Sequence, residues 1–292
     1  MKRLSLIISI SFFIGNGSAT GEAIKPKEGF VSVGDARIYY EEMGKGMPLV
    51  MVHGGLLDRH MWDDQFSTFA ETNRVIRYDA RGHGLSKAPS GTFSHHEDLK
   101  RLLDEIKVEK AVIMGLSMGG YVAVDFALAY PNRVRALILV APGLTGYEFE
   151  SEPLKKNNER INQAVRDNDL KMIVEYFQRA WTDGPARTPE KVDPGVREKV
   201  KQMALSSIQS RNAESREIRL EPEAIGRLAE IRVPTLAVVG DLDMPDIIEI
   251  VGLIEKNVKD SQKVVIKGVA HMVNMEKPEE FNRIIRDFLS EL

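Results

Sequence analysis

The chain has 292 residues, enough for one large α/β domain with an insertion or for two small domains. Apolar residues make up 43% of the chain, charged residues 28%, and the formal net charge is −3, which is ordinary for a globular protein. No basic stripe interleaved with aromatic residues occurs, which argues against a nucleic-acid partner. The chain lacks cysteine, so disulfides, thiolate metal sites and a cysteine nucleophile are excluded.

The N-terminus has the three-part pattern of a secretory signal peptide. Two basic residues precede the apolar stretch Leu4 to Gly15, and the small residues of GNGSATGEA follow it. We expect cleavage after Ala19, with Ala23 as a second possible site; the alternative is a buried N-terminal helix or strand. The stretch is shorter than the about 20 residues that span a bilayer. We therefore assign residues 1–24 to a signal peptide and expect an exported, periplasmic or secreted protein without a membrane span after processing.

Strand and helix patterns alternate along the chain as far as position 142. Continuous apolar runs of strand length predict buried strands, and amphipathic or wholly apolar stretches of 10 to 15 residues predict helices. This alternation predicts a largely parallel sheet with helices on both of its faces. The predicted strands span 30–33, 37–44, 48–54, 74–82, 110–117 and 134–142, and the predicted helices 95–108 and 118–130.

The rhythm breaks in residues 143–228, where strand-like runs are almost absent and the helical stretches are charged. The strand and helix pattern resumes after them, so we interpret this region as a helical cap inserted into a core formed by residues 25–142 and 229–292. One predicted cap helix has an apolar stripe through Phe177 and Trp181. We expect Met172, Tyr176 and Trp181 on it to line the substrate entrance; the alternative is packing within the cap.

The segment Gly115-Leu116-Ser117-Met118-Gly119 matches the pattern G-x-S-x-G between a predicted buried strand and a predicted helix. That context is typical of a nucleophile elbow, a turn so sharp that residues two before and two after the serine must lack side chains. It predicts Ser117 as a nucleophile, with the Met118 N–H at the start of a helix favouring nearby negative charge. The alternative is a glycine-rich helix start with a capping serine.

A serine hydroxyl needs a base, and the base needs an acid that holds its tautomer. His271 follows the last predicted strand and should lie at the carboxyl edge of the sheet, where Ser117 must also lie. His95 and His96, at the start of a helix, are expected to be solvated. Asp241 and Asp243 both follow another strand at that edge. Asp243 has the longer reach to His271, and Asp241 is the second candidate.

The oxyanion formed in acyl transfer needs two aimed donors. One candidate is the Met118 N–H. The other comes from the loop His53-Gly54-Gly55-Leu56, where glycines let the backbone approach a substrate closely. We predict the Gly55 N–H, with Leu56 as the alternative donor or as a substrate contact; a simple glycine turn is the other interpretation.

Taken together, the segments VHGG, YDARGHGLS, GLSMGG, VVGDLD and GVAH resemble the α/β-hydrolase family in order and rough spacing. The resemblance covers roughly residues 30–292 and is weakest in the cap. It implies a mostly parallel eight-stranded sheet with a helical cap after the sixth strand, and it supports Asp243 as the acid. Ser at the elbow argues against the dehalogenase and epoxide-hydrolase branches. Two glycines after His53 depart from the HGGG of some lipases. The chain is most similar to enol-lactonase-like and non-haem-peroxidase-like esterases.

These features predict a hydrolase that cleaves a small carboxylic ester or lactone through an acyl-enzyme on Ser117, with neither metal nor cofactor. The same fold with the same residues also accommodates a C–C bond hydrolase or a perhydrolase. A ligand-binding protein with a vestigial triad is the alternative from another class. The physiological substrate, the acyl-chain length and the oligomeric state are left open by the sequence.

Overall fold

The computed structural model describes residues 25–210, 212 and 214–292. The predicted signal peptide, residues 1–24, lies outside the described residues. Among the described residues, no helix is long and apolar enough to cross a membrane.

Within this described part, the main sheet has eight strands in the order β1-β2-β4-β3-β6-β7-β9-β10. The first two neighbouring pairs are antiparallel and every later pair is parallel, which confirms the predicted mostly parallel eight-stranded α/β-hydrolase sheet. The strands are β1 Lys27–Val33, β2 Ala36–Met43, β3 Met47–Val52, β4 Asn73–Tyr78, β6 Ala111–Leu116, β7 Val134–Val140, β9 Thr235–Gly240 and β10 Ser261–Ile266.

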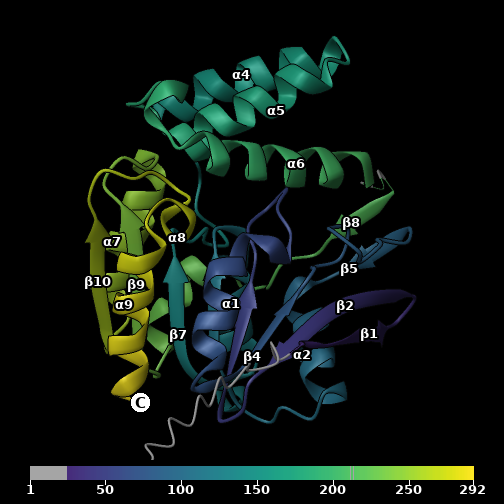
Figure 1. Ribbon diagram of the computed structural model, residues 1–292, viewed down its shortest axis with the longest axis vertical. Helices are drawn as coiled ribbons and strands as arrows, with labels where there is room; N and C mark the ends of the chain where they lie inside the picture. Colours follow the sequence, from purple (N-terminus) through teal and green to yellow (C-terminus); the bar gives the residue numbers. More distant parts are fainter. Residues whose placement is uncertain (1–24, 211, 213) are drawn as a thin grey trace, which may run out of the picture.

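Helices cover both faces of this sheet (Figure 1). One face carries α2 His95–Glu105, α3 Met118–Ala129 and α7 Pro245–Asn257, and the other carries α1 Asp63–Ala70, α8 Val273–Glu276 and α9 Pro278–Ser290. Successive side chains of a strand point to opposite faces of the sheet. Because helices cover both faces, successive positions of the strands are buried and apolar. On β3, Val50 and Val52 pack in the α3 core and Leu49 and Met51 in the α1 core.

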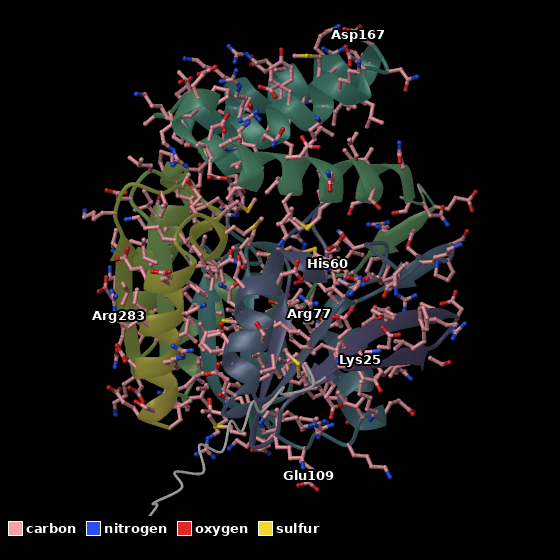
Figure 2. The ribbon with its side chains drawn as sticks, viewed as in Figure 1. Lys25, His60, Arg77, Glu109, Asp167 and Arg283 are labelled. Atoms are coloured by element: carbon pink, nitrogen blue, oxygen red, sulfur yellow. The ribbon has the colours of Figure 1, made fainter. Side chains whose placement is uncertain are left out.

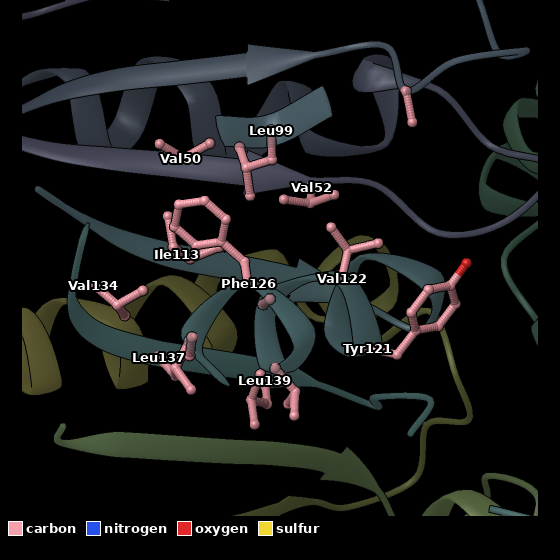
Figure 3. Packing of buried hydrophobic residues seen from close by; sticks show 14 of the residues in the cluster. Val50, Val52, Leu99, Ile113, Tyr121, Val122, Phe126, Val134, Leu137 and Leu139 are labelled. Carbon is pink, nitrogen blue, oxygen red and sulfur yellow. The ribbon is translucent and has the colours of Figure 1, made fainter. Parts of the chain in front are cut away.

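The α3 core packs densely against the central strands. Figure 3 shows Phe126 and Val122 of α3 among side chains of β3, β6 and β7, and Leu99 of α2 belongs to the same cluster. Tyr121 lies at the rim of this cluster, and its hydroxyl points away from the apolar side chains. The helix that follows Ser117 is therefore anchored by apolar contacts along its length.

The segment between β7 and β9 contains the helices α4 Glu152–Arg166, α5 Leu170–Gln178 and α6 Pro194–Ser210, and a π-helical turn at Arg179–Asp183. These helices stack beyond one end of the sheet (Figure 1). Asp167, between α4 and α5, lies at their outer tip (Figure 2). Short 3-10 turns at Pro189–Lys191 and Ala224–Glu230 belong to the same segment, and two others are described at Arg59–Trp62 and Pro131–Arg133.

One feature of this segment departs from the prediction. β8 Ser215–Glu217 pairs in parallel with β5 Gly91–Phe93, which follows β4 in the chain, to form a small second sheet. Three residues are too few for the period-two pattern that reveals a strand in a sequence. The pair ties the inserted segment to the core beside the sheet (Figure 1).

A buried carboxyl on α3 makes the stability of this core depend on pH. Asp125 is 1% exposed, one of its oxygens accepts a hydrogen bond from the Thr145 hydroxyl at 2.9 Å, and the other has no partner among the described residues. Burial raises the pKa of Asp125 to about 7, and the nearby Glu217 adds to this, whereas the Thr145 hydrogen bond opposes it.

We predict that Asp125→Asn alters the pH dependence of unfolding. Because the folded-state pKa lies above the unfolded one, the native wild type binds the extra proton. The contribution of Asp125 to the free energy of unfolding therefore falls as the pH rises from about 4 to 7, by up to about 1.4 kcal/mol per pH unit. The amide does not titrate, so the free energy of unfolding of the variant rises relative to that of the wild type as the pH rises across this window. Urea unfolding at pH 4 to 8 measures the difference, and a difference that is constant with pH contradicts the prediction.

Candidate active site

Ser117 occupies the turn between β6 and α3 with an unusual backbone, φ 55° and ψ −109°. A Cβ added to Gly115 would lie 2.0 Å from the Gly119 carbonyl oxygen, and one added to Gly119 would lie 2.2 Å from the Val52 carbonyl oxygen. No side chain fits at either position. This crowding is the physical reason for glycine two residues before and two residues after the serine.

His271 and Asp243 form a buried pair at the carboxyl edge of the sheet. The His271 Nδ1 lies 2.9 Å from one carboxylate oxygen of Asp243 and 3.1 Å from the other. The two residues are 1% and 3% exposed. The Nε2 of His271 has no hydrogen-bond partner among the described residues. A carboxylate on Nδ1 fixes the tautomer that leaves Nε2 able to accept a proton.

The second candidate acid, Asp241, is engaged elsewhere. Its carboxylate accepts a hydrogen bond from the Gly268 N–H at 2.6 Å and lies 3.7 Å from the Lys267 ammonium. Asp241 thus holds the turn after β10, and the structure places Asp243 beside His271.

Ser117 and His271 border the same cavity, which has a volume of about 650 Å³. Its wall near them is largely apolar and includes Leu56, Met118 and Trp181. The Trp181 ring lies 4.7 Å from the His271 ring, centroid to centroid, at an interplanar angle of 49°. The nucleophile and the base predicted from the sequence are therefore brought to one cavity by β6, the loop after β10 and the inserted segment.

The loop after β3 also reaches this cavity. Its Gly54 N–H donates to the Met61 sulfur at 3.3 Å, and no acceptor for the N–H groups of Gly55 or Leu56 is found among the described residues. Leu56 has a φ of 59°, an uncommon value for a residue other than glycine. Gly55 and Leu56 both border the cavity, so both predicted oxyanion donors stay candidates, opposite Met118.

His53 fixes the shape of this loop. It is fully buried, its Nε2 accepts a hydrogen bond from the Ala80 N–H at 2.9 Å, and its Nδ1 lies 2.8 Å from the Gly54 carbonyl oxygen. The Nδ1 therefore carries the proton and donates it to Gly54. Burial lowers the pKa of His53, so the imidazole stays neutral in this role.

Two of the three predicted entrance residues on α5 do not reach the cavity. Trp181 and Phe177, four residues apart on one helical face, line it, but Met172 and Tyr176 do not. Tyr176 is turned about 100° from Phe177 around the helix, and its ring packs under the Arg160 guanidinium of α4, 5.9 Å away. The prediction for Met172 and Tyr176 was wrong because the interface between α4 and α5 takes up that face.

The expectation that His95 and His96 are solvated was also wrong. They are 5% and 7% exposed, because the first turn of α2 packs against the core instead of facing water. The His95 ring lies 5.0 Å from the Phe93 ring of β5, and both residues line the cavity. This wall could not be predicted from the sequence, since β5 was not recognised as a strand.

The inserted segment is fastened to the histidine loop by a buried ion pair. Arg187 contacts both oxygens of Glu276, at 2.6 and 3.0 Å, and Glu276 accepts a hydrogen bond from the Ala270 N–H, next to His271. A Cβ on Gly184 would lie 2.3 Å from the carbonyl oxygen of Leu242, the residue before Asp243. One short stretch of the insertion thus packs on the loops that carry both Asp243 and His271.

The oxygen and nitrogen atoms of the described cavity residues are not grouped in the way that binds a metal ion. Within the part of the chain that the structure describes, no three His, Cys, Asp or Glu side chains are arranged to hold a metal ion. A serine hydroxyl and an imidazole that border one cavity, with a carboxylate bound to the imidazole, are groups that can carry out acyl transfer.

The fold and this arrangement agree with comparisons to known proteins. Residues 47–278 match the family described as alpha/beta hydrolase fold. The chain belongs to the alpha/beta hydrolase family. Among relatives of this alpha/beta hydrolase, a putative non-heme chloroperoxidase of Synechocystis is 28% identical over 269 residues, which cover 86% of this chain and 94% of the relative.

Two further similarities cover most of the chain. A 2-hydroxy-6-oxononadienedioate/2-hydroxy-6-oxononatrienedioate hydrolase of Pseudomonas putida is 30% identical, with 87% of this alpha/beta hydrolase and 92% of the relative covered. The crystallised thermophilic esterase of Thermogutta terrifontis is 29% identical, covers 91% of this chain and 98% of its own, and superposes with a TM-score of 0.74. The proteins to which this hydrolase is similar therefore carry the names of different activities.

We predict that the Arg187–Glu276 pair stabilises the loop that carries His271. Arg187→Met leaves a nearly buried carboxylate without its partner, which costs about 3 kcal/mol or more. Arg286→Met is the matched control, because Arg286 lies 3.6 Å from Glu71 in an exposed pair and its loss costs less than about 1 kcal/mol. Urea unfolding measures both variants. Equal small losses would show that the buried pair does not hold the loop.

Proposed function

We propose that this protein is a serine hydrolase that cleaves a carboxylic ester or lactone through an acyl-enzyme on Ser117. The observation that carries the proposal is the cavity that is lined by both Ser117, on a sharp turn with positive φ, and His271, whose Nδ1 is bound by Asp243. Met118 and either Gly55 or Leu56 supply backbone N–H groups beside it. Similarity to the esterase of Thermogutta terrifontis supports the ester as the substrate class.

In the proposed reaction the Ser117 oxygen attacks the ester carbonyl while His271 Nε2 takes the hydroxyl proton. The N–H groups of Met118 and Gly55 stabilise the oxyanion of the tetrahedral intermediate. Collapse of the intermediate breaks the ester bond, and the departing alkoxide takes the proton from Nε2. Water then attacks the acyl-enzyme with His271 as base, the acid leaves, and Ser117 regains its proton. Asp243 orients the imidazole throughout and stabilises its charged form.

We predict that a fluorophosphonate probe labels the folded protein at Ser117. Such probes mimic the tetrahedral intermediate and need an activated serine in a working oxyanion site. Mass spectrometry of tryptic peptides locates the label, and Ser117→Ala should abolish it. Ser206→Ala, which removes an exposed hydroxyl on α6, should label as the wild type does.

Two neighbouring aspartates provide a second control for the same experiment. Asp243→Asn should slow labelling by roughly 10³-fold or more, because the wrong tautomer of His271 is favoured. Asp241→Asn removes the same charge two residues before Asp243, and this variant should be labelled at nearly the wild-type rate. A label on another residue, or no label on folded protein, would refute Ser117 as the nucleophile.

C–C bond hydrolysis is the second candidate function, and the similarity to the hydrolase of Pseudomonas putida favours it. Perhydrolysis is a further use of the same acyl-enzyme, in line with the similarity to the putative non-heme chloroperoxidase of Synechocystis. A panel of short esters, lactones and β-diketones, with and without hydrogen peroxide, separates the three. We predict that esters or lactones give the highest kcat/KM, and faster turnover of β-diketones would favour C–C cleavage.

A further inference from the structure

The cavity has a second wall, away from Ser117 and His271, that the acyl-transfer chemistry does not use. It is formed by β5, β8 and the start of α2, and apart from Phe93 of β5 the lining side chains of these elements are polar. Tyr121, one helical turn after Ser117 on α3, lies between the two walls, since residues four apart on a helix are neighbours about 6 Å apart. The polar lining residues that carry the argument are His95, Ser207, Ser215, Glu217 and Arg219.

Glu217 and Arg219 form the charged centre of this wall. The Tyr121 hydroxyl donates to the Glu217 carboxylate, with oxygen distances of 2.9 and 3.0 Å. The Arg219 guanidinium lies 4.6 Å above the Tyr121 ring, and its Nε is 3.7 Å from the carboxylate. Tyr121 thus holds Glu217 by hydrogen bonds and packs against Arg219, whose side chain is 52% exposed. The Tyr121 hydroxyl points away from the apolar core (Figure 3).

Three polar side chains beside this pair have unused hydrogen-bonding capacity; His95 and Ser207 are buried and Ser215 is half-buried. Among the described residues, the hydroxyls of Ser207 and Ser215 have no partner, and no hydrogen bond to the His95 ring is found. Ser207 is 2% exposed and His95 is 5% exposed. Buried polar groups are normally paired, so a cavity bordered by residues whose hydroxyls lack a partner is suited to a polar ligand.

The charges of this wall cancel. Arg219 faces Glu217, and the cavity-lining Arg81 is neutralised by Asp98 at 2.8 Å. Burial holds the pKa of His95 well below its ordinary value, and the nearby His83 adds to this, so His95 stays neutral. A charged ligand group would enter with no uncompensated counter-charge to repay its desolvation. A neutral group that donates to Glu217 and accepts from Arg219 or from a hydroxyl satisfies the wall.

We propose that the wall of Glu217, Arg219 and His95 is a specificity subsite that binds an uncharged donor-and-acceptor group of the substrate, such as a carboxamide or hydroxyl. The group lies a few bonds from the carbonyl that Ser117 attacks. This inference rests on the proposed ester or lactone hydrolysis and adds the substrate class to it: a small ester with one apolar and one amide-like or hydroxylated part.

Matched esters test the subsite. One series varies the acyl part, with methyl adipamate, methyl heptanoate, monomethyl adipate and methyl 6-aminohexanoate as the amide, apolar, carboxylate and ammonium members. A second series places a carbamoyl or a methyl group at the far end of the alcohol part of an acetate ester. In one of the two series we expect the kcat/KM of the amide to be about tenfold that of the apolar ester, because the amide has the lower KM. A hydrogen bond to a charged group contributes enough binding free energy for a ratio of this size. The charged members should be the poorest.

Variants identify the wall as the cause. Glu217→Gln and Arg219→Met should each bring the ratio of amide to apolar kcat/KM toward one. Arg216→Met is the matched control, because Arg216 lies between Ser215 and Glu217 on β8, is exposed and does not border the cavity. This variant should keep the ratio of the wild type.

Calorimetric binding to Ser117→Ala separates failure of the subsite from failure of the proposed function, since it needs no turnover. Tighter binding of the amide than of the apolar ester, lost in Ser117→Ala/Glu217→Gln, supports the subsite even if no ester is hydrolysed. If esters are hydrolysed but neither series prefers the amide in turnover or in binding, the subsite is refuted and the hydrolase proposal stands. A preference for the carboxylate or the ammonium ester also overturns it.

Discussion

Ser117 is held in a backbone conformation with positive φ, and the placement of every group around it depends on that turn. Such a conformation costs of order 1–3 kcal/mol for a residue with a side chain. The surrounding backbone holds it: the Ser117 N–H donates to Val140, and its carbonyl oxygen accepts from the N–H groups of Gly120 and Gly143 at 2.9 Å each. The strain is sustained because β6, β7 and α3 are packed on both sides and cannot relax around one residue.

A second constraint is that the base and the acid reach the same rim from other strands. β9 and β10 are parallel neighbours, so the loops that follow them leave the sheet side by side and bring Asp243 to His271. The inserted segment then packs on those loops, with Arg187 bound to Glu276 and Gly184 against Leu242. The insertion therefore does more than cover the cavity, since it also fixes the loops that carry the proposed machinery.

The cavity combines two environments that suit different parts of a substrate. Apolar side chains surround the Ser117 end, where exclusion of water strengthens the electrostatic stabilisation of an oxyanion. The wall of β5 and β8 is polar and neutral overall. The machinery for acyl transfer comes from the sheet, whereas much of the second wall comes from the insertion and from β5.

Much of this protein was determined by local sequence. The alternation of strand and helix patterns predicted the sheet, because continuous apolar runs are intrinsic to buried parallel strands. The motif around Ser117 predicted a glycine-flanked elbow, because the steric need for Gly115 and Gly119 is local. Order along the chain was enough to select His271 from six histidines as the residue that follows the last strand.

Tertiary structure decided what depends on contacts between distant segments. The sequence left Asp241 and Asp243 both possible, and only the packing of the β9 and β10 loops places Asp243 on the imidazole. It predicted Met172 and Tyr176 at the cavity, but α4 covers that face of α5. The pairing of β5 with β8 could not be foreseen, since strands of three residues have no periodicity to detect. Residues such as Glu217 and Arg219 acquire their neighbours only through that pairing, which is why local pattern alone did not reveal them.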